Sequence, residues 1–236
     1  YIIENKIDVY KTDSLKYVLE NFFNNFGIFI LVIVVMIAGT IVSEEFNKGT
    51  IKLLLVKPYS RNKILLSKLL TTFIMIAFVI AVVLIMEIIV GGITFGFDSI
   101  SEPTVVYNFN TQSIQEINIF AYVGIEILTQ LPMIILLGTL AFAISTIFTN
   151  SALAITISLL GYMSTMFINQ LAIIYDIKIL KYFVTMNWDL TPYLFGGLGN
   201  MEGMSMPMSI IICIVYFILI AIPTFWVMKK RNIKNI

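Results

Sequence analysis

The chain has 236 residues, of which 59% are hydrophobic and only 12% are charged, and its mean hydropathy is +0.95. A soluble domain carries about 25% charged residues, so these charges are too few to cover a water-facing surface, and lipid must be the main solvent. The sequence contains no His and one Cys, which excludes disulfide frameworks, Cys/His zinc sites and His-based catalytic triads. The net charge of +1 does not indicate a class of partner.

Five apolar stretches are each long enough to cross a bilayer as a helix, which takes about 20 residues. They lie at 26–42, 69–90, 127–148, 153–175 and 210–228. Each must be helical, because a backbone in hydrocarbon has to satisfy its own hydrogen bonds. The third span could be preceded by an interfacial turn that begins at Ile119. We therefore expect an all-α, polytopic transmembrane helix bundle.

The connections between these stretches alternate in charge. Residues 43–68 and the C-terminal tail hold ten of the fifteen basic residues, whereas residues 1–21, 91–118 and 176–206 hold ten of the fourteen acidic ones. Since basic connections stay in the cytoplasm, we expect 43–68 inside and the three acidic segments outside. An outer N-terminus on a chain that does not begin with Met predicts a missing first span, and six spans in the complete protein.

The segment before the first span has two possible structures. It forms an interfacial helix capped by Asp13 or Ser14, or it is an unstructured connector to the missing span. The helical alternative places four apolar side chains on one face, namely Leu15, Val18, Leu19 and Phe22.

The cytoplasmic connection, residues 43–68, is predicted to contain a short amphipathic helix. Gly49 permits an unusual backbone turn, and Thr50 can cap a helix over residues 50–57. Pro58 ends that helix, and Ser60 caps the next one. One face of the short helix is apolar and carries Ile51, Leu54 and Leu55. By physical argument alone, this face packs either against lipid headgroups or in the groove of a partner protein.

The order of residues in this connection resembles the loop after the second span in permeases of the type-2 ATP-binding-cassette exporter class. The family pattern is an acid, Gly-Thr, a Leu pair, Pro-x-Ser-Arg and a Lys that leads into the next span. It occurs here as Glu45, Gly49, Thr50, Leu54, Leu55, Pro58, Ser60, Arg61 and Lys68. The resemblance implies that residues 50–57 are the coupling helix that docks on a separate ATPase subunit, with the flanking residues framing it.

The resemblance also implies an architecture and an assembly. Residues 1–236 would form one permease domain in the cytoplasmic membrane of a prokaryote, paired with a second copy or a related permease. Residues 176–206 would form short outer helices that re-enter the membrane, although the residues alone fit an amphipathic surface hairpin as well. No phosphate-loop motif occurs in the chain, so ATP and Mg would be held by the partner ATPase, and we expect neither a cofactor on this chain nor a nucleic-acid partner.

Two acidic residues lie within the predicted spans, and both are near the outer surface. Glu87 and Glu126 either line a substrate path or remain hydrated by snorkelling. Two other functions stay open. The chain could be a membrane sensor or scaffold that binds a cytoplasmic partner through residues 43–68 without transport. The chain could also be a membrane-embedded lipid-modifying enzyme, which is the less favoured alternative because the spans do not offer convergent polar groups at one depth.

Overall fold

The computed structural model describes residues 14–50 and 60–231, and five of its helices are long and apolar enough to cross a membrane. These are α2 (Phe22–Thr40), α5 (Arg61–Phe95), α6 (Ile119–Phe148), α7 (Ser151–Ile174) and α9 (Met206–Lys230). They coincide with the five predicted stretches. Helix α6 is continuous from Ile119, so the predicted interfacial turn is its first turn. After α2 the chain continues through two residues into the short helix α3 (Ser43–Asn47).

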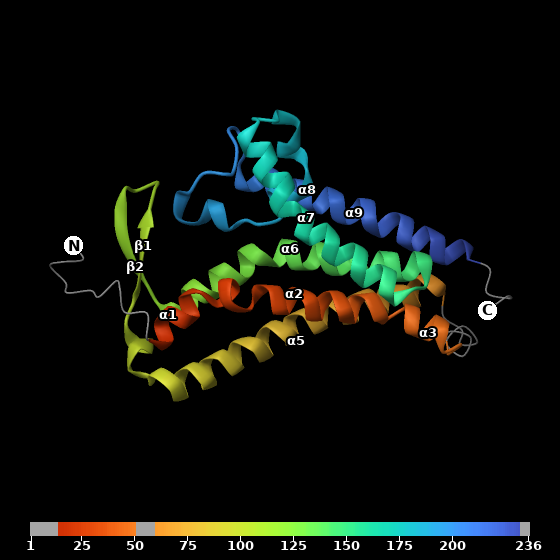
Figure 1. Cartoon of the computed structure of the whole chain (residues 1–236), viewed down its shortest axis with the longest axis horizontal. Helices are drawn as coiled ribbons and strands as arrows, with labels where there is room; N and C mark the ends of the chain where they lie inside the picture. The colour runs from red at the N-terminus through yellow and green to blue at the C-terminus, as the bar shows by residue number, and fades with distance from the viewer. Residues whose placement is uncertain (1–13, 51–59, 232–236) are drawn as a thin grey trace.

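Successive long helices run in opposite directions, so their connections gather at two ends of the bundle (Figure 1). One end holds α3, the start of α5, the turn between α6 and α7, and the end of α9. We call it the basic end, because most of the described Lys and Arg side chains are there. The opposite end holds the first helix, a β-hairpin and residues 175–205. The predicted alternation of charge therefore corresponds to two physical ends.

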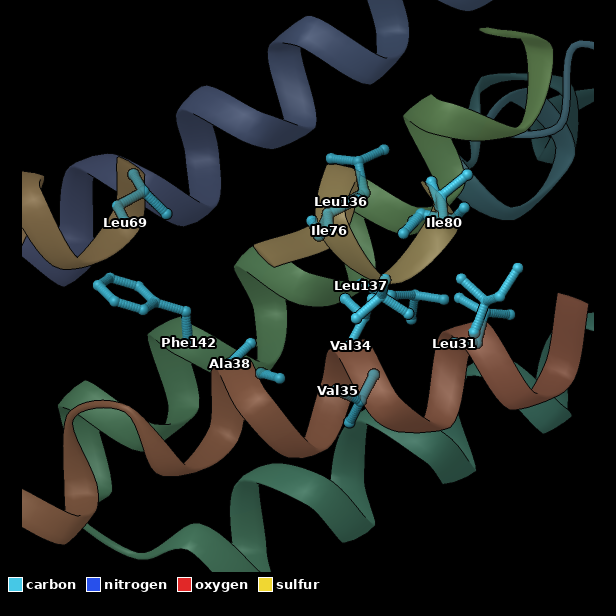
Figure 2. Close-up of a cluster of buried hydrophobic side chains, with 14 of the residues drawn as sticks. Leu31, Val34, Val35, Ala38, Leu69, Ile76, Ile80, Leu136, Leu137 and Phe142 are labelled. Carbon is cyan, nitrogen blue, oxygen red and sulfur yellow. The ribbon is translucent and has the colours of Figure 1, made fainter. Parts of the chain in front are cut away.

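Helices α2 and α6 form the centre of the bundle, and α5 packs beside them (Figure 2). Val34 of α2 and Ile76 of α5 both approach Gly138 of α6. A Cβ atom added at Gly138 would lie 3.2 Å from Val34 Cγ1 and 3.4 Å from Ile76 Cδ1. Lipid tails are as apolar as these side chains, so close packing at small residues, rather than exclusion of water, holds such helices together.

Helix α5 is much longer than a bilayer crossing requires. Its 35 residues span about 52 Å at 1.5 Å per residue, against a hydrocarbon core about 30 Å thick. Ser60 caps its start by accepting a hydrogen bond from the Lys63 amide at 3.4 Å, as the sequence predicts. Gly96, with a φ of +81°, ends it. Local capping chemistry therefore extends the helix beyond its apolar stretch.

The N-terminal segment forms helix α1 (Leu15–Glu20), so the helical alternative is confirmed for the described residues. The Ser14 hydroxyl oxygen caps it by accepting a hydrogen bond from the Tyr17 amide at 3.2 Å; Asp13 lies outside the described residues. Leu15 and Leu19 are buried against residues of α6, namely Ile119 and Val123. Helix α1 is therefore packed on the bundle itself.

A β-hairpin stands at the end opposite the basic end (Figure 1). It follows a short 3₁₀ helix, η1 (Asp98–Ser101), and consists of β1 (Thr104–Asn108) and β2 (Ser113–Ile117), paired antiparallel. The Phe109 amide in its turn donates a hydrogen bond to the Phe195 carbonyl at 2.8 Å. The sequence predicted an all-α chain, and this hairpin corrects that prediction.

The segment between α7 and α9 contains three short helices, η2 (Lys178–Tyr182), α8 (Val184–Asn187) and η3 (Thr191–Gly196). Asn187 is fully buried. Its amide nitrogen donates to the carbonyls of Lys181 and Phe183 at 2.7 and 2.8 Å, and its amide oxygen accepts from the Ser209 hydroxyl at 2.8 Å. The Leu190 amide donates to a carbonyl of α6 at 3.2 Å. The segment is thus anchored to both α6 and α9.

Candidate functional site at the basic end

The basic end contains an ion pair between two helices that the sequence separates by the 48–60 connection. Glu45 of α3 and Lys68 of α5 form a salt bridge, and their side chains are only 26% and 14% exposed. The Lys68 ammonium also donates to the Ile41 carbonyl at 3.2 Å. A charge-assisted bond that is shielded from water is stronger than a neutral one. The pair therefore joins the end of α2 and α3 to the start of α5.

A second set of contacts centres on Arg231, which follows the end of α9. Its guanidinium donates to the Thr146 carbonyl of α6 at 2.6 Å and lies 4.8 Å from the centre of the Phe46 ring. Its own carbonyl accepts from the Arg61 guanidinium at 2.5 Å. Burial lowers the pKa of the Arg231 guanidinium, but arginine stays charged in proteins. One residue thereby connects α3, α5, α6 and α9.

A buried pair of serines completes the cluster. The Ser43 amide, at the start of α3, donates to the Ser145 hydroxyl oxygen of α6 at 3.1 Å. The Ser43 hydroxyl donates in turn to the Gly39 carbonyl at 2.9 Å. A Cβ atom added at Gly39 would lie 3.0 Å from Ile155 Cγ1, so α2 and α7 also approach closely here. All five long helices thus meet at or near the basic end.

The predicted coupling residues fall into two groups. Glu45 pairs with Lys68, Arg61 bonds to the Arg231 carbonyl, and Ser60 caps α5. Gly49 has a φ of +70°, which fits the predicted turn, and the Thr50 hydroxyl donates to the Glu45 carbonyl at 3.4 Å. The rest of the predicted helix at 50–57 lies outside the described residues, and so do the remaining predicted residues, Leu54, Leu55 and Pro58.

Sequence reasoning missed the contacts of Arg231 with Thr146, Phe46 and Arg61. It treated Lys229, Lys230 and Arg231 alike, as basic residues of the tail. The first two are exposed, whereas Arg231 turns back onto α6 and α3. Nothing in a run of three cations distinguishes the residue that packs inward. Phe46 carries a weak signal, since a lone aromatic beside Glu44 and Glu45 suggests an inward-facing position.

Glu87 and Glu126 lie away from this cluster, near the opposite end of the bundle. They are only 4% and 7% exposed, so neither side chain snorkels to the surface. Both carboxylate oxygens of Glu87, and Oε2 of Glu126, have no hydrogen-bond partner among the described residues. The two acids open onto different cavities: Glu87 onto an apolar one beside α5, and Glu126 onto a polar one. They therefore do not form one continuous polar path.

The fold and the polar cluster define an α-helical protein whose five long apolar helices are suited to crossing a membrane. The chain belongs to the family described as protein of unknown function DUF2705, whose model matches residues 3–234.

Two relatives from Bacillus subtilis (strain 168) are similar over most of this chain. The uncharacterized protein YhcI is 32% identical over 215 residues, which cover 89% of this chain and 67% of YhcI. The uncharacterized membrane protein YdbK is 28% identical over 208 residues, or 88% of this chain and 79% of YdbK. No solved structure matches the chain.

Proposed function

We propose that this chain is the membrane-spanning permease subunit of an ATP-binding-cassette exporter, a multi-pass protein of a prokaryotic cytoplasmic membrane. A separate ATPase subunit hydrolyses ATP and docks on residues 50–57. The observation that supports this proposal most is the cluster of Glu45, Lys68, Arg61 and Arg231. It joins both ends of the 48–60 connection to the long helices.

A partner that pushes on residues 50–57 acts on a segment whose two ends are held firmly. On the N-terminal side, the Glu45–Lys68 pair passes force into α2 and α5. On the C-terminal side, the Arg61–Arg231 bond passes force into α9 and, through Thr146, into α6. Since partly buried charged hydrogen bonds resist separation more than exposed ones, the force moves helices rather than bending the loop. This is the mechanical requirement for coupling ATP hydrolysis to transport.

The charge distribution supports a cytoplasmic basic end, because Lys and Arg concentrate in connections that stay inside the cell. Assembly with a second copy or a related permease is part of this proposal, and the largely uncovered apolar faces of two helices are the surfaces that such a partner would share with lipid. Helices α7 and α9 expose Leu160, Phe167, Ile211 and Leu219. In this proposal, substrate leaves between the two permeases, and residues 176–206 re-enter the outer leaflet before α9.

Cysteine labelling tests the orientation. Asn62→Cys at the basic end and Ser113→Cys in the hairpin are both exposed sites, and each is made in a Cys213→Ala background. A membrane-impermeant maleimide should label Ser113→Cys in intact cells and Asn62→Cys only after lysis. Labelling of Asn62→Cys in intact cells would place the basic end outside and overturn the proposal.

A capture experiment tests the partner. Residues 50–57 are replaced by a Gly-Ser linker of equal length, and the same replacement of 109–112 in the hairpin turn is the matched control. A phosphate-loop ATPase should co-purify with the natural protein and with the control, but not with the 50–57 replacement. If the ATPase co-purifies equally well in all three cases, the coupling assignment is wrong. Capture of a partner without ATPase activity would instead favour a sensor or scaffold.

A further inference from the structure

A polar cavity of about 480 Å³ lies near the end of the bundle opposite the basic end. Side chains from α1, α2, α6 and α7 and from the segment after α8 line it. Three of them are acidic, namely Glu20, Glu126 and Asp189, and the lining formed by described residues includes no Lys or Arg. The cavity is therefore a partly open, acidic space between helices that are mostly apolar.

One side of the cavity is a fixed hydrogen-bonded group. The Gln130 amide nitrogen donates to Asp189 Oδ1 at 3.1 Å and to the Thr191 hydroxyl oxygen at 2.8 Å. The Thr191 amide also donates to Asp189 Oδ1, at 2.9 Å. These bonds hold the Asp189 carboxylate in place. The Gln130 amide oxygen has no partner within the described part of the chain and is left as a buried acceptor.

Glu126 supplies a second buried acceptor on the same cavity. Glu126 is only 7% exposed, and its Oε2 atom accepts no hydrogen bond from residues 14–50 or 60–231. A buried acceptor left without a donor destabilises the protein, and a charged one does so more strongly. Glu126 Oε2 and the Gln130 amide oxygen are two such acceptors on residues that line one cavity, beside the Asp189 carboxylate. Together they call for a ligand rich in hydrogen-bond donors.

The lining also indicates what kind of donor fits. No group of three or more His, Cys, Asp or Glu side chains in the described chain is arranged to hold a metal ion. The rings of Tyr122 and Tyr162, and the side chains of Met133 and Leu31, line the same cavity. Aromatic faces attract organic cations, and an ammonium group has three donors and no acceptor. The lining therefore favours an organic cation with an apolar portion over a bare metal ion.

We infer that this cavity binds the ammonium group of an amphipathic organic cation, with Glu126 as the principal counter-ion. Asp189 and the Gln130 amide oxygen complete the polar contacts, and the tyrosine rings cover the apolar portion. This inference rests on the proposed function: such a cation is the class of substrate that the permease exports.

Glu87 provides a matched control within the same molecule. It is as deeply buried as Glu126, and its carboxylate oxygens are likewise unpartnered in the described structure. It opens, however, onto a separate and almost wholly apolar cavity lined by residues such as Val82 and Met86. Neutralising Glu87 removes a buried acid whose side chain does not line the polar cavity, although its charge interacts with that of Glu126.

Binding of a fluorescent amine tests the inference. Dansylcadaverine carries a primary ammonium, and its N-acetyl derivative has the same fluorophore without the charge. The purified full-length protein in lipid nanodiscs is titrated with each, without nucleotide or ATPase. Because a hydrogen bond to a charged group contributes about 1.5–3 kcal/mol, the charged probe should bind the natural protein about tenfold to a hundredfold more tightly. Glu126→Gln should abolish this preference, and Glu87→Gln should keep it.

Equal affinity of the natural protein for the two probes overturns the inference, and that comparison needs no variant to fold. Equal losses in Glu126→Gln and Glu87→Gln would overturn it as well, since they would show a general response to losing a buried acid. If the protein binds the charged probe selectively but captures no ATPase, the cation site is supported, and its proposed role in ATP-driven export is wrong. If the protein captures an ATPase but binds both probes equally, the permease proposal stands, and only the cation site is wrong.

Discussion

Breaking the Glu45–Lys68 ion pair should destabilise the bundle by about 2 kcal/mol, a value between those of exposed and buried ion pairs. Exposed pairs contribute about 0–1 kcal/mol, whereas removing one partner of a buried pair costs about 3–5 kcal/mol. These side chains are mostly but not fully shielded from water. Lys68→Met keeps the apolar stem in place, but it leaves the Glu45 carboxylate without its cation and the Ile41 carbonyl without its donor.

A double-mutant cycle of Glu45→Gln and Lys68→Met isolates the pair. Unfolding is followed in mixed detergent–SDS micelles by the fluorescence of the two tryptophans. The control cycle uses Glu44→Gln and Lys48→Met, which break a 2.7 Å pair at the same short helix whose side chains are 51% and 68% exposed. That exposed pair should contribute only about 0.2–0.5 kcal/mol. If the two coupling energies are equal, the Glu45–Lys68 pair does not hold α3 to α5 as argued.

Three further predictions use the same unfolding measurement. Arg231→Gln should destabilise the protein by about 1.5–3 kcal/mol, because a carbonyl of α6 loses a charged donor; the exposed neighbour Lys229→Gln should change stability by less than about 0.5 kcal/mol. Gly138→Leu should cost about 1–3 kcal/mol by forcing α2 and α5 away from α6, whereas Gly124→Leu, where a Cβ meets nothing within 4 Å, should be nearly neutral. Asn187→Leu should cost about 3 kcal/mol or more, since two carbonyls and the Ser209 hydroxyl each lose a hydrogen bond to this buried side chain. A loss as small as that of Gly124→Leu would show that α8 is not anchored as described.

Features that depend on neighbours in the sequence were predictable. The five helices follow from hydropathy, since an apolar run of sufficient length has few other structures in lipid. The cap at Ser60 and the turn at Gly49 follow from backbone and side-chain chemistry that acts over three or four residues. The hairpin was missed although Thr104–Asn108 is rich in β-branched and aromatic residues, because its flanks were interpreted only by their charge.

Contacts between distant residues could not be predicted in the same way. The tail position of Arg231 gives no sign that it packs on Phe46. Likewise, Glu126 and Asp189 belong to segments whose relative position depends on how α6 and the connection after α8 pack. The resemblance to exporter permeases named Glu45 and Lys68 as framing residues, but it did not say that they pair. Partners across the bundle are set by helix packing, which a single sequence does not reveal.

The length of α5 has a mechanical consequence. A straight helix of about 52 Å that tilts by about 5° around its midpoint displaces each tip by about 2 Å. Its far part is not free to swing, since Leu15 of α1 lies so near Gly91 that an added Cβ would be 2.7 Å from Leu15 Cδ1. A rotation started at Arg61 would therefore press on α1, so a movement at one end of α5 would reach the other end of the bundle.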